Sequence, residues 1–410
     1  RESFQLENQD LEVVTIIGLD GSLTYIESWV DYQYDAEGNL IGASGGSITR
    51  GTDIFGNAYI TTSEDTYIIW AGEAKKRGAN SITASQSIDG SISSTSGAVR
   101  YEYTDGIEDP AGFSSAYSDE NGNVFIGLLK NASGASITRG EDIFGNAYVT
   151  TAIDQYTIIR GEAKKIRSDT VTTSETIDGS TSTATGYVNY EYTDGTEDPG
   201  SLSSQYSYEE GAIRRVYAGL LKHAEGRGVT EGIDLFGNRY TTTTTDEYIQ
   251  VNGEAKVWKS ISDTESLSIA GTKTLSRSGV VYGYADGTED SATLPLEYLD
   301  KDGKAFIGFL HAARDIEGLE NYSTSEDVFG NTYTTTTINE YEIIGGRAKV
   351  VRSDSVTNSI GIDGLISITM GRIEYEYSTE SAPYLNPDTG RSGVGALIGA
   401  SGTNIVRGED

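Results

Sequence analysis

Apolar and polar side chains alternate with a period of two along most of the chain. In the run AVRYEYTD, Val99, Tyr101 and Tyr103 fall on one face of an extended segment, and Arg100 and Glu102 fall on the other. Such alternation, in runs rich in Thr, Ser, Val, Ile and Tyr, is typical of strands with one buried face. No helical period is sustained. The pattern predicts an all-β protein with long strands of about 12–15 residues.

The same alternation predicts the faces of two other kinds of strand. In the run 254–269, Val257, Ile261, Leu267 and Ile269 are expected on one face, with Trp258 as the exception. The runs TTTTTDEY and TTTTINEY suit strands with one wet face, because β-branched threonine fits the pleat. A regular hydroxyl array for a glycan or for ice, or a site of O-glycosylation, is the alternative.

Turn signals recur between the strands in a fixed order. The motif D-x-F-G-N begins at Asp53, Asp142, Asp234 and Asp327, at spacings of 89, 92 and 93 residues. Gly-Asn tolerates the positive φ angles of tight hairpin turns. Equivalent turns are therefore expected around Gly56, Gly145, Gly237 and Gly330. Further signals are x-G before E/R-A-K, D-G, and an acidic loop after a Y-x-Y strand.

A fixed spacing of turns indicates tandem repeats of about 90 residues. The expected units are a partial repeat 1–52, repeats 53–141, 142–233 and 234–326, and an incomplete terminal repeat 327–410. No linker separates them, which favours an elongated stacked β-sandwich or a continuous antiparallel β-meander. Later repeats carry about 20 extra residues that resemble an added hairpin. Adding one strand would reverse alternate repeats, and adding two would not.

The net charge of the chain disfavours some classes of binding partner. Lys and Arg number 30 and Asp and Glu 62, which gives a formal net charge of −32. Nucleic acid and anionic membranes are disfavoured partners, whereas cation binding is favoured. There is no cysteine, hence no disulfide framework, and no apolar run long enough to span a bilayer. The start RESFQLENQD has no initiator Met or signal peptide, so we expect a processed product or a window onto a longer chain.

The acidic loops are the candidate metal sites. Hard cations such as Ca²⁺ need several carboxylate and carbonyl oxygens from a flexible loop. No loop has EF-hand spacing, and solvated turns that keep edges apart by repulsion are the alternative. The nine candidate ligands, three in each of three loops, are Asp105, Glu108, Asp109, Asp194, Glu197, Asp198, Asp286, Glu289 and Asp290.

Tyrosine is frequent, at 27 residues. Aligned repeats are expected to place Tyr103, Tyr192, Tyr284 and Tyr377 in register. A structural ladder of stacked rings is one interpretation, and a carbohydrate-binding platform is the other.

Catalytic constellations are absent from the sequence. His223 and His311 are the only histidines and do not align between repeats, so a histidine triad or zinc site is not expected. G-x-S-x-G and phosphate-loop motifs are also missing. We therefore expect no enzyme, no catalytic residue and no cofactor other than Ca²⁺.

Two resemblances follow from these motifs. The phrase YQYDAEGNL resembles the Y-x-Y-D-x-x-G-N-L core of YD repeats, which occur in large bacterial surface and toxin-encapsulating shells. The wider pattern, GASG with D-x-F-G-N, Y-x-I-I-x-G-x-A-K and V-x-Y-x-Y, resembles tandem repeats of very large bacterial surface or extracellular proteins. This resemblance implies secretion, a structural or adhesive role at the cell surface, and no known catalytic residues.

The expected function is that of a non-enzymatic extracellular building block of a surface filament, fibre or adhesin stalk. The partners would be copies of itself joined head to tail through strand edges, or flanking repeats of the same giant chain. Residues 1–17 are expected to form one strand, and residues 395–410 another, each without its hairpin partner. A secreted module that binds a glycan or surface, and part of a YD-type shell around a toxin, are the alternatives.

Overall fold

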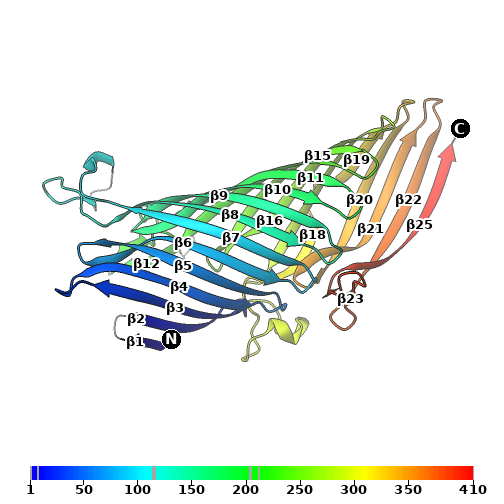
Figure 1. Ribbon diagram of the computed structural model, residues 1–410. Coiled ribbons are helices and arrows are strands. Elements are labelled where there is room, and N and C mark those ends of the chain that lie inside the picture. The colour runs from blue at the N-terminus through cyan, green and yellow to red at the C-terminus, as the bar shows by residue number, and fades with distance from the viewer. Residues whose placement is uncertain (1, 7–8, 113–116, 203–205, 211–212, 410) are drawn as a thin grey trace.

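The computed structural model describes residues 2–6, 9–112, 117–202, 206–210 and 213–409 (Figure 1). Its main element is a single 21-stranded antiparallel sheet. Strands that follow one another along the chain also lie next to one another, apart from the loop hairpins described below. The predicted all-β fold is confirmed, and of the two architectures considered the protein adopts the continuous meander.

Each repeat contributes four positions to this sheet, and the strand bounds recur from repeat to repeat. The first half of the sheet consists of β1 (Glu2–Leu6), β2 (Gln9–Ile17), β3 (Leu23–Tyr34), β4 (Leu40–Thr52), β5 (Ala58–Trp70), β6 (Glu73–Gln86), β7 (Ile92–Tyr103), β8 (Leu129–Glu141), β9 (Ala147–Ile159), β10 (Glu162–Glu175) and β11 (Thr181–Tyr192). The second half consists of β14 (Leu221–Ile233), β15 (Arg239–Val251), β16 (Glu254–Leu267), β17 (Lys273–Tyr284), β18 (Leu310–Asp315), β19 (Asn321–Glu326), β20 (Thr332–Ile344), β21 (Arg347–Ile360), β22 (Ile366–Tyr377) and β25 (Leu397–Glu409). Because β18 and β19 both pair with β17, they are two pieces of one interrupted strand.

The extra residues of the later repeats do not join the main sheet. They form two separate hairpins, β12 (Ser207–Glu210) with β13 (Ile213–Val216) and β23 (Tyr384–Leu385) with β24 (Ser392–Gly393). They also form the short helices η1 (Pro110–Gly112), η4 (Ser291–Thr293) and η5 (Leu296–Tyr298). The main sheet therefore gains no strand from the insert, and successive repeats run in the same direction.

A β-bulge interrupts the hairpin that follows each D-x-F-G-N turn. The register shifts beside Tyr67, Lys165, Tyr248 and Tyr341. A bulge adds one residue to one strand and so changes the face on which later side chains lie. For this reason Val257 and Ile261 do not share a face as predicted: Val257 lies opposite Tyr248, whereas Ile261 lies opposite Thr245, on the other side of the bulge.

The strands end at two edges that differ in chemistry. At the first, which we call the turn edge, lie the D-x-F-G-N turns and the turns that contain Gly21, Gly90, Gly179, Gly271 and Gly364, which we call the D-G turns. At the second, which we call the loop edge, lie the long inserts and the x-G turns. The two edges follow from the four-strand repeat, because every second connection in a meander falls on the same side.

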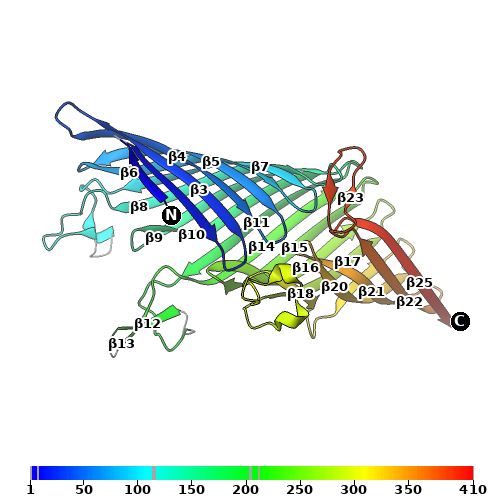
Figure 2. The same ribbon diagram turned by 90° about the horizontal axis from the view of Figure 1, so that it is seen from below.

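The sheet coils, so that the turn edge of the early strands meets the loop edge of much later ones (Figures 1 and 2). The partial repeat 1–52 contacts repeat 234–326, and repeat 53–141 contacts repeat 327–410. A D-G turn thus meets the insert three repeats further along. We call this line of contacts the seam.

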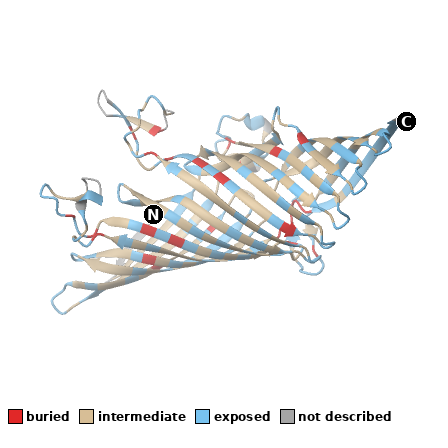
Figure 3. Ribbon diagram, turned by 90° about the horizontal axis from the view of Figure 1, so that it is seen from above, coloured by how far each residue is buried: buried red, intermediate tan, exposed pale blue. Residues whose placement is uncertain are grey.

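Burial is sparse on both faces of the sheet (Figure 3). Most strand positions alternate between half-buried and exposed, as in β7, where Val99, Tyr101 and Tyr103 are half-buried and Arg100 and Glu102 are exposed. Fully covered side chains gather instead in the inserts, at the strand ends beside them and at the seam. No helix among the described residues is long and apolar enough to cross a membrane.

The predicted glycine turns are confirmed, with φ of 89° at Gly56, 98° at Gly145, 88° at Gly237 and 88° at Gly330. Nothing lies within 4 Å of a Cβ added to Gly330 or to Gly112, whose φ is not in the positive region. Gly330→Ala should therefore lower stability by about 1–2 kcal/mol through backbone strain alone. Thermal melting is the measurement, with Gly112→Ala as the control. Equal melting temperatures for the two variants would contradict the turn assignment.

Candidate functional site: the seam

The D-x-F-G-N motif builds a compact five-residue turn. In the first copy the Asp53 carboxylate accepts hydrogen bonds from the amides of Phe55 and Asn57, at 2.9 Å each. The side-chain amide of Asn57 donates back to the second carboxylate oxygen at 2.6 Å. Asp and Asn commonly stabilise turns in this way. The YD-like segment 35–39 closes the same turn, from Asp35 to Asn39, at the loop edge.

The asparagine of each D-x-F-G-N turn also ties neighbouring hairpins together. The side-chain oxygen of Asn57 accepts a hydrogen bond from the amide of Ile88, in the next D-G turn, at 2.8 Å. The same bond joins Asn146 to Ile177, Asn238 to Ile269 and Asn331 to Ile362. Along the turn edge, each D-x-F-G-N turn and the D-G turn that follows it are therefore held in fixed relative positions.

Backbone hydrogen bonds cross the seam at equivalent places. The amide of Ile307 donates to the carbonyl of Leu19 at 2.8 Å, and the amide of Val394 donates to the carbonyl of Ile88 at 3.0 Å. Leu19 and Ile88 both precede the D-G dipeptide of their repeat, and Ile307 and Val394 both end an insert. The seam is thus a repeating interaction and not a single chance contact.

Aromatic rings fill the seam beside these hydrogen bonds. Phe55 meets Tyr298 edge-on with centroids 5.7 Å apart, and Tyr298 stacks on Phe309 at 4.6 Å. One repeat further on, Phe144 meets Tyr384 at 5.6 Å. The phenylalanine of D-x-F-G-N is therefore an anchor of the contact between windings, in addition to being part of a turn.

The close approach of neighbouring atoms explains why glycine stands at two positions of the seam. A Cβ on Gly21 would lie 2.4 Å from Cγ2 of Ile54 and 2.8 Å from Cε2 of Phe306. A Cβ on Gly346 would lie 2.8 Å from the ring of Phe55. At these positions glycine allows the two edges to interlock.

Polar contacts complete the second part of the seam. The Arg391 guanidinium donates to the carbonyl of Asp142 at 2.7 Å and pairs with the Glu141 carboxylate. The side chain of Asn386 donates to the carbonyl of Ile143 at 2.8 Å. Asn386 and Ile143 are 5% and 4% exposed, so this hydrogen bond is fully desolvated. Buried polar groups of this kind are costly to leave unpaired.

The nine carboxylates proposed as metal ligands serve the turns of their own loops. Glu108 accepts hydrogen bonds from the amides of Asp105 and Gly106 and pairs with Lys130 at 2.8 Å. Glu197 and Glu289 repeat this arrangement in their loops, facing Lys222 at 3.5 Å and His311 at 3.9 Å. The first-position aspartates Asp105, Asp194 and Asp286 and the last-position aspartates Asp109, Asp198 and Asp290 each accept from an amide two residues ahead.

Within the described ranges, no three acidic or histidine side chains converge on a point that could hold a metal ion. The carboxylates of one loop are instead distributed among separate amide donors. This geometry assigns the nine carboxylates to turn formation, and the three glutamates in addition face the basic residue near the start of the next strand.

Hydrogen bonds, and not ring stacking, hold the aligned tyrosines in place. The hydroxyls of Tyr103, Tyr284 and Tyr377 donate to the carbonyls of Lys76, Val257 and Val350, at 2.8, 2.9 and 3.1 Å. Each of these carbonyls belongs to the residue just before a bulge. Equivalent tyrosines lie four strand positions apart, about 19 Å, because neighbouring strands are about 4.8 Å apart. They do not stack on one another. Tyr103, Tyr284 and Tyr377 each fasten the bulge of their own repeat, and among the described contacts Tyr192 has no such hydrogen bond.

Threonine hydroxyls form a second repeating feature. Thr61 pairs with Thr83 across β5 and β6 at 2.8 Å. The same pair recurs as Thr150 with Thr172, Thr242 with Thr264, and Thr335 with Thr357. Thr242 and Thr244 of the first threonine run and Thr335 of the second are therefore engaged in cross-strand hydrogen bonds, which supports the structural interpretation of these runs.

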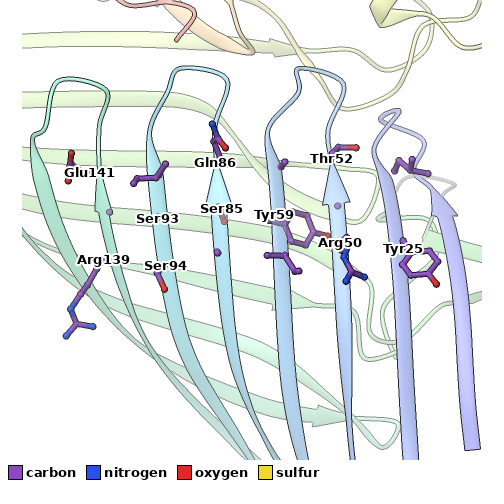
Figure 4. A pocket seen from close by; sticks show the side chains of 17 residues that line it. Tyr25, Arg50, Thr52, Tyr59, Ser85, Gln86, Ser93, Ser94, Arg139 and Glu141 are labelled. Carbon is purple, nitrogen blue, oxygen red and sulfur yellow. The ribbon is translucent and has the colours of Figure 1, made fainter. Parts of the chain in front are cut away.

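A hollow of about 910 Å³ lies on the sheet beside the turn edge (Figure 4). Tyr25, Arg50 and Arg139 project from β3, β4 and β8 on the face opposite the threonine pairs. The ring of Tyr59 lies across Gly51 on the other face, and Glu141 lies at the rim of the hollow. Aromatic and charged groups together can bind a polar ligand.

Sequence reasoning located the turns but not their partners. The roles of Tyr298, Asn386 and Arg391 have no signal in the repeat pattern, because each lies in an insert of variable sequence. The aromatic residue at D-x-F-G-N was the available clue, since a solvated turn has no need of phenylalanine.

Arg391→Met removes three seam hydrogen bonds, to the carbonyl and carboxylate of Glu141 and to the carbonyl of Asp142, which keeps only the amide of Gly145 as donor. We expect a loss of about 1–3 kcal/mol in stability, and faster hydrogen exchange in the turns 87–91 and 142–146. Arg372→Met is the matched control, because Arg372 pairs with Asp354 on the sheet and not at the seam. Equal exchange in the two variants would show that Arg391 does not hold the seam.

Acid should loosen the insert 104–128. The hydrogen bond from Lys130 lowers the pKa of Glu108 to about 2. A carboxylate whose pKa is lowered on folding stabilises the fold above its unfolded pKa of about 4.3, and this contribution disappears as the pH falls toward 2. Lys130→Met should therefore reduce the drop in melting temperature between pH 5 and pH 2.5. Lys273→Met, from an exposed pair with Glu265, should leave that drop unchanged.

Calcium is expected to have no effect on stability, because the loop carboxylates already serve amides and lysines. Melting curves in chelator and in millimolar Ca²⁺ should coincide, since only a ligand that binds the folded state shifts the midpoint. A rise in melting temperature with Ca²⁺, abolished by Asp194→Asn, would restore the metal hypothesis.

Comparison with known proteins gives no match, either to a protein-family model or to a curated protein. The functional interpretation therefore depends on the geometry of the seam and of the sheet edges.

Proposed function

We propose that this chain is a non-enzymatic, extracellular structural protein: a building block of a surface filament, fibre or adhesin stalk that assembles through β-strand edges. The observation that carries the proposal is the repeating seam. The same backbone hydrogen bond joins Leu19 to Ile307 and Ile88 to Val394, one repeat apart. An architecture held by such a contact extends with each added repeat, as solenoids do.

The open strand β25 supports assembly through edges. It is a 13-residue strand that pairs with β22 along one side, and no pairing is described along its other side. Ile405 and Val406 are 62% and 66% exposed. A long strand with exposed apolar side chains and no proline is a template for another strand.

The N-terminal segment differs from the expectation. Residues 1–17 were predicted to be a single strand, but β1 and β2 pair with each other as a hairpin. The available edge at this end is therefore the outer side of β1, which spans Glu2–Leu6. Strand addition between β25 of one copy and β1 of the next would continue the antiparallel meander.

The extracellular setting is part of the proposal. It draws on the resemblance of the D-x-F-G-N pattern to repeats of large bacterial surface proteins. The net charge of −32 fits a surface polymer that stays soluble through self-repulsion.

A glycan- or surface-binding module is the second candidate, and the hollow beside the turn edge is the observation that favours it. Tyr25 is 36% exposed there and lies directly opposite Arg50, and Arg139 lies on the same face four strands away from Arg50. Binding of acidic and neutral oligosaccharides, lost in Tyr25→Ala, would support this function. Part of a YD-type toxin-encapsulating shell is the third candidate, favoured by the coil and by the YD-like turn at Asp35.

The purified chain should form elongated assemblies in negative-stain electron micrographs. Denaturing electrophoresis should separate these assemblies into single chains, because the copies are joined by strand pairing and not covalently. Ile405→Lys places a charge on the open strand and should shorten or abolish the assemblies.

Ile338→Lys is the control for added charge, because Ile338 is 73% exposed but lies in a strand with neighbours on both sides. A monodisperse monomer at all concentrations and salt conditions would contradict the proposed function.

A further inference from the structure

The turn edge is covered in its first half and open in its second half. Ile143 and Phe144, in a covered D-x-F-G-N turn, are 4% and 37% exposed, whereas Phe236 and Phe329, in the open ones, are both 72% exposed. The contrast is weaker in the D-G turns, because at the seam Ile88 is half-buried whereas Leu19 is 61% exposed. The open apolar positions of the later turns are Ile177, Leu235, Phe236, Ile269, Val328, Phe329 and Ile362.

The loop edge shows the complementary pattern. In the insert 104–128, Phe125 and Ile126 are 48% and 55% exposed. Their counterparts Phe306 and Ile307 are half-buried at the seam, and Val394, the counterpart of Ile126 in the last repeat, is 7% exposed. On each edge, one half is thus engaged in the seam, and the other half exposes equivalent apolar side chains to solvent.

We propose that the open half of the turn edge binds the open half of the loop edge of a second copy of this chain, so that the seam continues from one molecule to the next. This inference rests on the proposed function and names its interface. The coiled sheets of two copies stack through their edges, and strand addition at β25 is a second contact between the same two copies. Continuity with the existing seam identifies the partner, because these turns match inserts of the same sequence type.

The register follows from extending the contacts within the chain into the second copy. Within the chain a D-G turn meets the insert three repeats further along, and the same offset is kept between the two molecules. The amide of Ile126 in the second copy would donate to the carbonyl of Ile269, as Ile307 donates to Leu19. Tyr117 would meet Phe329, as Tyr298 meets Phe55. Such an interface has different surfaces on its two sides and does not close on itself, so it propagates as a filament.

The charged residues that would meet at the proposed interface are compatible with this register at one position and repel each other at another. Within the chain Arg347 pairs with Asp89. Glu73 takes the position of Arg347 in the second copy and would face Ala270, where the aspartate is absent. Glu162 would face Asp363, a like-charge contact that salt screens. Stacking should therefore strengthen as ionic strength rises.

The first test compares two exposed apolar positions. Phe329→Ser should weaken self-association about tenfold or more, because it removes an anchor of the interface. Ile338→Ser is the matched control, since Ile338 is 73% exposed and lies away from both edges. Sedimentation velocity over a range of protein and salt concentrations measures both. Equal association of the two variants would overturn the inference.

The second test uses the absence of cysteine from the chain. Ile126→Cys and Ile269→Cys molecules, mixed and oxidised, should give a disulfide-linked dimer, because residues joined by one backbone hydrogen bond lie within disulfide reach. Leu19→Cys with Ile307→Cys in one chain is the positive control. Ile126→Cys mixed with Ile338→Cys gives the background of random collisions.

The outcomes separate this inference from the proposed function. Filaments that form without the 126–269 cross-link, and that survive Phe329→Ser, would refute stacking through the seam while leaving strand-edge assembly standing. A chain that remains monomeric throughout would refute both. Cross-linking at 126–269 that rises with salt and is lost in Phe329→Ser confirms the seam as the interface.

Discussion

Contact between successive windings of the sheet is the interaction on which this structure depends. The meander is a single sheet whose strand positions are mostly half-buried or exposed, so neither face supplies a conventional core. Burial is instead concentrated in the inserts and at the seam, where Ile143, Val394 and Asn386 are nearly inaccessible. A coil whose edges interlock obtains tertiary contacts that a flat sheet of the same length would lack, because only coiling brings turns and inserts together.

One turn design is used for several purposes. The Asp-x-x-Gly-Asn turn closes hairpins at the turn edge, where its phenylalanine anchors the seam and its asparagine fixes the neighbouring D-G turn. At the loop edge the same turn appears at Asp35 without the phenylalanine and closes a hairpin alone. The Asp35 turn lacks the aromatic side chain, which in the first two D-x-F-G-N turns, at Phe55 and Phe144, meets a ring of the facing insert.

The repeats also explain why chemistry is sparse. Carboxylates, tyrosine hydroxyls and threonines recur at fixed positions, and most have a partner in their own or an adjacent strand. Glu108 is engaged by Lys130, and Tyr103 by the carbonyl before a bulge. Residues committed to the same internal contact in successive repeats support the structural function proposed above.

The sequence alone determined the strands, the period of about 90 residues and the positive φ at Gly56 and its equivalents, because alternation and turn chemistry are local properties. It could not place Val257 and Ile261 on opposite faces, since one bulged residue changes the face without changing the pattern. Nor could it show that Phe55 meets Tyr298, or that Arg391 reaches Asp142, because the coil that joins these residues depends on the summed twist of many strands. The candidate metal loops show the same limit: composition identified the carboxylates, and only the tertiary structure decided that amides and lysines occupy them.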